Sequence, residues 1–237
     1  MKKFLVMALA AMALMAACKK DSDSAIPQTS SNFMFFNGVP NTTFGVLIDS
    51  VRISSGVPFG QATAYRSFKA QAYNLYLYNT AAPNVLINFG QVNLRNGKYI
   101  STYLGIDTTN AIPGGLRLTL AEDDLSAVPA QQARYRVVDM SDTYKTLRNN
   151  KTALAMDFRV DTSRYIYGFR AMQFTAFSTF KTIRGDSSYK LNVNWVDSTK
   201  QLGTFPMNLQ SGKVYTFVAT GNALDSLNFK VFAIQHN

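Results

Sequence analysis

The stretch YKLNVNW, residues 189–195, carries the signal that decides the fold class. Its larger apolar side chains, Tyr189, Leu191, Val193 and Trp195, alternate strictly with lysine and asparagine. A period of two is typical of a β-strand with one face in a core and one in solvent, because successive side chains of a strand point to opposite faces. We therefore expect a half-buried strand here, with Trp195 packed in the core.

The same period recurs elsewhere in the chain. LRLTL (residues 116–120) and LAMDFRV (residues 154–160) alternate in the same way, and no run longer than a turn or two has helical spacing. Glycine stands beside asparagine, aspartate or serine at residues 95–98 and 184–187, which suits tight turns that need positive φ. The patterning therefore predicts an all-β protein.

The chain also resembles itself. TAYRSFK (residues 63–69) aligns with TAFSTFK (residues 175–181), 112 residues further on. LRNGKY (residues 94–99) aligns with LQSGKV (residues 209–214), 115 residues further on. Two blocks in the same order indicate a duplicated domain. The difference between the two offsets predicts a three-residue insertion between the blocks.

A boundary between the copies is expected at AEDDLSAVPA, residues 121–130. We assign residues 32–121 to the first domain, 122–131 to a linker and 132–237 to the second domain. Adjacent carboxylates can serve acid–base chemistry only where their environments separate their pKa values. We expect Asp123 and Asp124 to be exposed parts of a connector.

The run LAEDDLSAVPAQQARYRVVDMSD, residues 120–142, resembles the junction in tandem members of the domain of unknown function family 4397, a family of exported bacterial β-sandwich proteins. The strand–turn–strand segments at residues 35–49 and 139–158, and the hairpin at 209–217, are similar to the family as well. Residues 139–151 are longer than the family pattern. The resemblance covers residues 31–237. It implies two tandem immunoglobulin-like antiparallel β-sandwich domains, an envelope or surface location and no enzyme activity.

The N-terminus reads as a cleaved signal peptide, residues 1–17. Lys2 and Lys3 precede an apolar segment at residues 4–17, which is too short for a transmembrane helix of about 20 residues. The sequence LMAAC, ending at Cys18, resembles the bacterial lipobox, which implies lipidation of that cysteine and attachment to the outer membrane. The alternative is an ordinary secretory signal with an incidental cysteine. Mass spectrometry of the mature N-terminus distinguishes the two.

Residues 18–31 read as a flexible tether because serine, threonine, glutamine and proline dominate them. The charged start KKDSD, residues 19–23, is similar to the signal that sends lipoproteins of Bacteroidota to the outer face of the outer membrane. A merely solvated tether would have almost the same composition. We therefore expect an exported, lipid-anchored protein, and its exposure on the cell exterior is the more specific form of that expectation.

Composition restricts the chemistry of the body. Cys18 is the only cysteine, so the folded domains contain no disulfide, cysteine zinc site or thiol nucleophile. Without the two lysines of the signal, 22 Lys and Arg stand against 14 Asp and Glu, a net charge of +8. These cations are scattered singly along the chain. We interpret them as a solvated basic surface and expect no nucleic-acid partner.

No constellation of residues points to catalysis. The only histidine, His236, is the penultimate residue and is expected at a frayed terminus. One histidine and a lipidated cysteine cannot supply the three or four ligands of a zinc site, and no glycine-rich phosphate loop follows a strand and opens a helix. Asp139, Ser141 and Asp142 come closest to a calcium cluster, but a polar turn explains them better. We predict no catalytic residues, no metal and no cofactor.

An aromatic strand is the remaining candidate surface. In AYNLYLYN, residues 72–79, alternation places Tyr73, Leu75 and Leu77 on one face and Asn74, Tyr76 and Tyr78 on the other. Outward tyrosines beside amides can stack on sugars and offer amphipathic contact area. The alternative is equally physical, because tyrosine is favoured in strands and forms cross-strand pairs.

We therefore expect a non-enzymatic surface lipoprotein that binds an extracellular glycan or protein, or mediates adhesion. Asn74, Tyr76 and Tyr78 are the candidate ligand-binding residues, and Cys18 is the attachment to the membrane. The alternative function is a structural spacer or a subunit of an envelope assembly with no soluble ligand.

Overall fold

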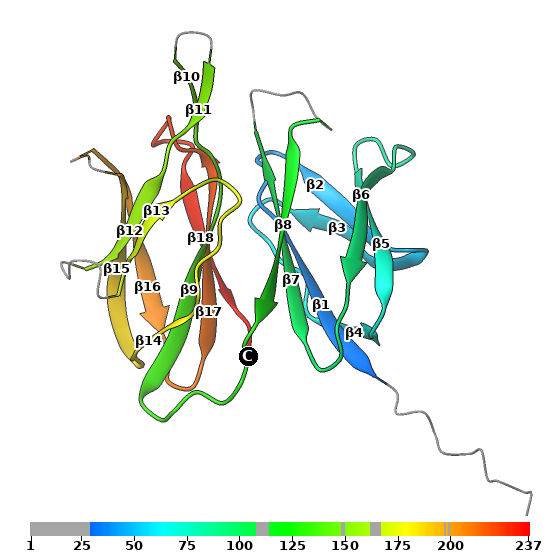
Figure 1. Ribbon diagram of the computed structural model, residues 1–237, viewed down its shortest axis with the longest axis horizontal. Coiled ribbons are helices and arrows are strands. Elements are labelled where there is room, and N and C mark those ends of the chain that lie inside the picture. The colour runs from blue at the N-terminus through cyan, green and yellow to red at the C-terminus, as the bar shows by residue number, and fades with distance from the viewer. Residues whose placement is uncertain (1–28, 108–113, 148–149, 162–166, 197, 199) are drawn as a thin grey trace, which may run out of the picture.

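The computed structural model describes residues 29–107, 114–147, 150–161, 167–196, 198 and 200–237. The predicted signal peptide, Cys18 and most of the predicted tether lie outside these residues. Within them all regular structure is β-strand, and no helix occurs. The strands form two β-sandwiches that stand side by side (Figure 1). The prediction of an all-β protein with two tandem sandwich domains is confirmed.

The first sandwich has an outer sheet of order β3-β2-β5-β6 and an inner sheet of order β4-β1-β7-β8. Its strands are β1 (Ser30–Asn37), β2 (Thr43–Ile48), β3 (Val51–Pro58), β4 (Arg66–Lys69), β5 (Ala72–Asn79), β6 (Ile87–Asn93), β7 (Tyr99–Ile106) and β8 (Leu116–Asp123).

The second sandwich repeats this order, with an outer sheet β13-β12-β15-β16 and an inner sheet β14-β9-β17-β18. Its strands are β9 (Gln132–Asp142), β12 (Met156–Val160), β13 (Phe169–Met172), β14 (Lys181–Arg184), β15 (Ser187–Trp195), β16 (Gln201–Leu209), β17 (Val214–Asn222) and β18 (Lys230–Gln235). A hairpin of β10 (Tyr144–Leu147) and β11 (Asn150–Ala153) is inserted after β9. This hairpin accounts for the extra length of residues 139–151.

The register of the duplication differs from the sequence prediction. The bridge between Phe36 and Ala62 corresponds to the bridge between Val138 and Phe177, so this part of the repeat has an offset of 115 residues. The other block has the same offset, because Tyr99 of β7 pairs with Asn32 of β1 as Val214 of β17 pairs with Arg134 of β9. The predicted three-residue insertion is therefore wrong. Serine, threonine and aromatic residues recur through both segments, so a shift of three residues still aligned similar side chains.

The two central strands of each inner sheet run parallel, whereas the expectation was of antiparallel sandwiches. β1 pairs in parallel with β7, and β9 with β17, while the other pairs in these sheets are antiparallel. Parallel neighbours need a long crossover, and here the crossover passes through the outer sheet. Strands buried on both faces read as continuous apolar runs, as Phe33–Met34–Phe35–Phe36 does in β1.

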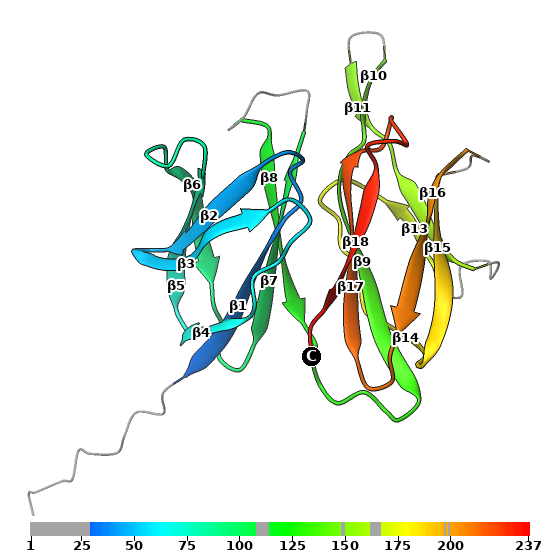
Figure 2. The ribbon, with the colours of Figure 1, turned by 180° about the vertical axis from the view of Figure 1, so that it is seen from behind.

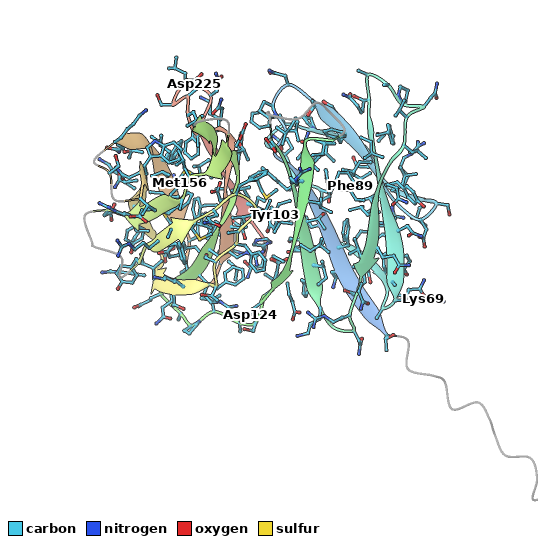
Figure 3. The ribbon with its side chains drawn as sticks, turned by 45° about the horizontal axis from the view of Figure 1, so that its top comes forward. Lys69, Phe89, Tyr103, Asp124, Met156 and Asp225 are labelled. Atoms are coloured by element: carbon cyan, nitrogen blue, oxygen red, sulfur yellow. The ribbon has the colours of Figure 1, made fainter. Side chains whose placement is uncertain are left out.

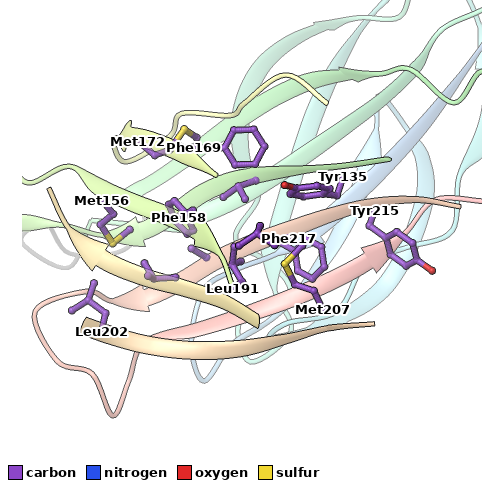
Figure 4. Packing of buried hydrophobic residues seen from close by; sticks show 14 of the residues in the cluster. Tyr135, Met156, Phe158, Phe169, Met172, Leu191, Leu202, Met207, Tyr215 and Phe217 are labelled. Atoms are coloured by element: carbon purple, nitrogen blue, oxygen red, sulfur yellow. The ribbon is translucent and has the colours of Figure 1, made fainter. Parts of the chain in front are cut away.

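Three apolar layers separate the four sheets. The core of each sandwich lies between its inner and outer sheet, and Figure 4 shows the core of the second. Trp195 packs partly buried against that core, as expected. A third layer lies between the two inner sheets and joins the sandwiches. It consists of Met34, Phe36, Tyr103, Ala121, Val138, Met140, Phe174 and Val218.

This interdomain layer makes the two sandwiches one packed body. Tyr103 lies between them in Figure 3, and the C-terminus lies between their lower ends in Figures 1 and 2. The strands leave residues 124–131 as the connector, so Glu122 and Asp123 belong to β8 and not to the linker. Burying apolar area on both inner sheets favours this docked arrangement over two independent domains.

Asn37 and Asp139 occupy matched positions in the two copies. The backbone of Asn37 is hydrogen-bonded to residues 60 and 61, and the backbone of Asp139 is hydrogen-bonded to the equivalent residues 175 and 176. The Asn37 amide donates to the carbonyls of Thr42 and Val57, and its oxygen accepts from the Val39 N–H. Among the described residues, the Asp139 carboxylate accepts only from the backbone N–H and hydroxyl of Ser141, and its buried Oδ2 has no partner. Burial raises the pKa of Asp139 to about 7. The predicted polar turn at Asp139–Asp142 is wrong, because these residues end β9.

The variant Asp139→Asn is therefore expected to gain stability over the natural chain as pH rises. The folded-state pKa of Asp139 lies above its unfolded value, so its contribution is present at acidic pH and lost as pH rises towards 7. Asparagine does not titrate, so the stability difference should shift in its favour by about 2 to 4 kcal/mol between acidic and alkaline pH. Urea unfolding at about pH 4.5 and about pH 8 measures this. A difference that is independent of pH would contradict it.

Candidate functional site

The candidate aromatic surface lies on the outer sheet of the first sandwich. In β5, Leu75 and Leu77 are fully buried in the core, while Asn74, Tyr76 and Tyr78 face away from it and are half-buried. The two faces of β5 therefore carry the side chains that alternation predicted. We call Asn74, Tyr76 and Tyr78 the aromatic face.

The Tyr78 ring lies across the neighbouring strand β2. Its Cα partner there is Gly45, and a Cβ on Gly45 would stand 2.0 Å from the Tyr78 Cζ. The ring therefore occupies the space that a side chain at residue 45 would fill. The Tyr78 hydroxyl donates to the Ser55 carbonyl at 3.3 Å, so both ends of the ring have a defined position. A ring fixed in this way needs little ordering when it contacts a ligand.

The other two residues of the aromatic face differ in how far they are engaged. Tyr76 lies between its partners Leu47 of β2 and Asn88 of β6. The Asn74 side chain donates to Asp49 at 3.3 Å, and the same carboxylate accepts from the Asn74 backbone N–H. Asn74 therefore has one donor committed to the fold, and the two tyrosines remain the principal contact groups.

Exposed apolar side chains extend this surface. Val85 is 59% and Leu86 57% exposed just before β6. Leu77 of β5 pairs with Ile87, the first residue of β6, so Leu86 directly precedes the strand that lies beside β5. Apolar side chains exposed beside half-buried tyrosines form a surface that suits contact with another molecule.

The duplication supplies an internal comparison for the aromatic face. In the second sandwich, β12 and β15 correspond to β2 and β5 of the first. Their pairing places Asn192 and Asn194 of β15 where β5 has Tyr76 and Tyr78. Asn192 is hydrogen-bonded to Gln201 and Thr204 on that face. The second copy therefore forms the same outer sheet with two asparagines at these positions, and it has Asp157 where the first copy has Gly45.

A second polar cluster, which the sequence analysis did not identify, lies between the sandwiches. The Arg136 side chain forms a buried ion pair with Asp123 and donates to the Tyr103 hydroxyl at 2.9 Å and to Thr216 at 3.1 Å. The Tyr65 hydroxyl donates to Asp123 at 2.6 Å and contacts His236 Nδ1 at 2.8 Å.

Thr216 closes this cluster by contacting His236 Nε2 at 2.7 Å. We call Tyr65, Asp123, Arg136, Thr216 and His236 the interdomain network. The Tyr65 hydroxyl gives its only proton to Asp123, so it accepts from His236 Nδ1–H, and Nε2 accepts from Thr216. The network thus holds His236 as the neutral Nδ1–H tautomer.

The electrostatics of the network agree with this assignment. Burial, together with the nearby Arg136 cation, lowers the pKa of His236 to about 3. Burial also raises the pKa of Asp123, while Arg136, Ser101 and Tyr65 oppose that rise by binding the carboxylate. Desolvation is the largest effect on the pKa of both Asp123 and His236, and it disfavours the charged form of each. The Asp123 carboxylate is charged because it is paired with Arg136, whereas the His236 imidazole is neutral.

Two expectations from the sequence are wrong at this point. Asp123 is buried at the end of β8 and is not an exposed connector residue, whereas Asp124 is exposed. His236 is not frayed, because its backbone N–H donates to Val214 and its side chain joins the network. A buried role for Arg136 was readable in principle, since a cation inside the apolar run of β9 requires a partner.

Two residues of the network, Asp123 and His236, occupy matched positions in the two copies. Asp123 of β8 lies opposite the first residue of β7, and His236 lies opposite Val214, the first residue of β17. Arg136 in β9 corresponds to Met34 in β1. The groups of the network bond to one another inside the interface, where they connect the two inner sheets. The arrangement therefore holds the domains together.

Within the described part of the chain, no group of three or more His, Cys, Asp or Glu residues is placed to hold a metal ion. The same residues contain no helix that is both long and apolar enough to span a bilayer. Cys18 is outside the described residues, so the structure does not bear on its lipidation.

Residues 31–148 match the family described as Domain of unknown function (DUF4397). The match covers the first sandwich, the connector and the start of the second sandwich, and it confirms the resemblance over those residues. No curated protein matches the sequence.

Similar solved structures include three bacterial proteins. The Bacillus anthracis TIE protein has 6% identity and a TM-score of 0.27, with 82% of this chain and 51% of that chain covered. This chain thus spans about half the length of the TIE protein. The family CBM26 module CBMbc of Eubacterium rectale Amy13K, in complex with maltoheptaose, has 8% identity and a TM-score of 0.28, with 85% and 96% covered. A proposed cell adhesion protein from Bacteroides eggerthii DSM 20697 has 9% identity and a TM-score of 0.28, with 90% and 97% covered.

Proposed function

We propose that this chain, which belongs through residues 31–148 to the DUF4397 family, is a non-enzymatic surface protein that binds an extracellular glycan or protein through its aromatic face. In this proposal a lipid on Cys18 anchors it to the outer membrane, and the tether lets the paired sandwiches extend from the surface. The observation that carries the proposal is the presence of Tyr76 and Tyr78 where the second copy has asparagines.

The chemistry of the aromatic face supports this function. A tyrosine combines a flat apolar ring, which stacks on a sugar or an apolar side chain, with a hydroxyl that hydrogen-bonds at its rim. The Tyr78 ring is already held across Gly45, so a ligand that contacts it restricts little additional side-chain motion. The neighbouring amides and the exposed Leu86 add polar and apolar contacts around the two rings.

The decisive experiment compares two matched pairs of substitutions in the full chain. Binding to an array of glycans and surface proteins is measured for the natural chain, for Tyr76→Ala/Tyr78→Ala and for Asn192→Ala/Asn194→Ala. We expect the tyrosine pair to weaken binding by about tenfold or more, because two aromatic contacts contribute on the order of 1 to 3 kcal/mol. The asparagine pair should bind as the natural chain does.

A thermal melt of each variant separates loss of binding from loss of fold. The proposal fails if the folded tyrosine variant binds like the natural chain, or if both pairs lose affinity equally. The first result would favour the second candidate function, a structural spacer. The observation that favours that candidate is the interdomain layer with its network, which makes the two sandwiches a single packed unit.

A further inference from the structure

A hollow of about 510 Å³ lies in the second sandwich, away from the aromatic face. Three segments that are distant in sequence form it: the end of the connector with the start of β9, the residue Tyr167 ahead of β13, and the edge strand β14. Its lining residues are Ala130, Gln131, Gln132, Tyr167, Thr182, Ile183 and Arg184.

The backbone around the hollow is held in place by hydrogen bonds. Gln131 has a φ of 62°, which a residue with a side chain adopts only when its surroundings impose it. Its N–H donates to the Ser211 hydroxyl at 2.8 Å, and its carbonyl accepts from the Gly185 N–H at 2.8 Å. The Tyr167 carbonyl accepts from the buried Tyr135 hydroxyl. The walls on both sides are therefore positioned before any ligand arrives.

The polar side chains of the hollow are not engaged with the protein. Among the described residues, the amides of Gln131 and Gln132, the hydroxyls of Thr182 and Tyr167 and the Arg184 guanidinium have no hydrogen-bond or ion-pair partner. These groups bring donors, acceptors and one positive charge to one place. They are available to a ligand without breaking a protein contact.

Another hollow, of about 400 Å³, shows the contrast. It lies beside Lys98, Glu122 and Asp124 at the end of β8. There Lys98 is paired with Glu122 at 2.6 Å, and Asp124 is paired with Arg134 at 2.7 Å. Its charged groups already neutralise one another. The hollow of the second sandwich, by comparison, has a cation and no carboxylate in its lining.

We propose that the hollow at Arg184 binds a saccharide that carries a carboxylate, such as a hexuronate unit. The Arg184 guanidinium matches a carboxylate through two parallel hydrogen bonds. The Gln131 and Gln132 amides and the Thr182 hydroxyl donate to and accept from sugar hydroxyls, and the Tyr167 ring offers a stacking surface. The buried Ile183 forms an apolar floor.

The other charged groups near the hollow do not oppose an anionic ligand. The Lys181 ammonium donates to the Gly168 carbonyl at 2.6 Å, and Asp186 accepts from the Ser211 N–H at 2.9 Å. The Asp186 carboxylate therefore points to the hairpin at Ser211 and is not among the residues that line the hollow. This site belongs to the second sandwich and does not depend on the aromatic face of the first.

The test uses the full chain, with trigalacturonate and its neutral counterpart galactotriose as ligands in isothermal titration calorimetry. Arg184→Gln removes the charge from the hollow. Lys69→Gln is the matched control, because Lys69 pairs with Ser30 in β4 as Arg184 pairs with Gln132 in β14. Both side chains are exposed, so neither substitution disturbs a core.

We expect trigalacturonate to bind the natural chain and galactotriose to bind about tenfold more weakly or not at all. Arg184→Gln should weaken trigalacturonate binding by about tenfold, whereas Lys69→Gln and Tyr76→Ala/Tyr78→Ala should leave it unchanged. The proposal is overturned if trigalacturonate does not bind, if galactotriose binds equally well, or if Lys69→Gln weakens binding as much as Arg184→Gln. Loss of binding only in the tyrosine variant would assign the ligand to the aromatic face and also overturn it.

Discussion

Replacing Arg136 by methionine is expected to lower the free energy of unfolding by about 3 to 5 kcal/mol, because it leaves a buried carboxylate without its cation. Arg136 is 1% exposed and is paired with Asp123, and it also donates to Tyr103 and to the Glu122 carbonyl. Methionine is a suitable replacement because Met34 occupies the matched position in the first sandwich. Any loss then reflects the network rather than an unsuitable shape.

The double variant Arg136→Met/Asp123→Asn tests this cause. Removing both charges eliminates the unpaired carboxylate, so the double variant should recover a large part of the lost stability. Guanidinium unfolding of the two single variants, the double variant and the natural chain gives the coupling energy. A loss below about 1 kcal/mol for Arg136→Met would show that the ion pair does not hold the interface.

The network should also make the interface sensitive to acid. The pKa of His236 is lowered to about 3 by burial and by Arg136, so the unfolded chain binds a proton near pH 6.5 and the folded chain does not. Stability contributed by the neutral imidazole is therefore complete above about pH 6.5 and is lost as pH falls towards 3. The groups that face the imidazole are Tyr65, Thr216 and the Arg136 cation. None of these favours an imidazolium.

The variant His236→Gln isolates this effect, because glutamine can donate and accept but does not titrate in this range. We expect the natural chain to lose about 2 kcal/mol or more relative to the variant between pH 7 and pH 4. Asp139 shifts stability in the opposite sense over this window, but it is present in both proteins and cancels in the comparison. A stability difference that stays constant with pH would contradict the assignment of His236 as a buried neutral group.

The alternation of apolar residues was enough to predict the class of fold and the faces of the outer strands. In YKLNVNW and AYNLYLYN it separated buried from outward side chains, because each outer sheet has one face in a core and one in solvent. The central strands of the inner sheets, such as β1 and β17, do not alternate, since both of their faces are buried. Their runs, such as FMFF in β1, indicate burial but not the partner that covers them.

The interdomain network could not be predicted from residue patterns. Tyr65 and His236 contact each other across 171 positions of the chain, and Asp123 stands in an acidic run that resembles a solvated connector. The hollow at Arg184 was missed for the same reason, since three separate segments line it. The duplication was detected, but its register was fixed only by strand pairing.

The central claim is that the aromatic face of the first sandwich contacts the ligand. Its most direct test is amide chemical-shift mapping of the isotope-labelled chain, titrated with a glycan or protein that the array identifies. We predict that the largest perturbations fall on β5 around Tyr76 and Tyr78, with smaller ones on the paired strands β2 and β6. Perturbations confined to other parts of the molecule, with β5 unchanged at saturation, would contradict the claim.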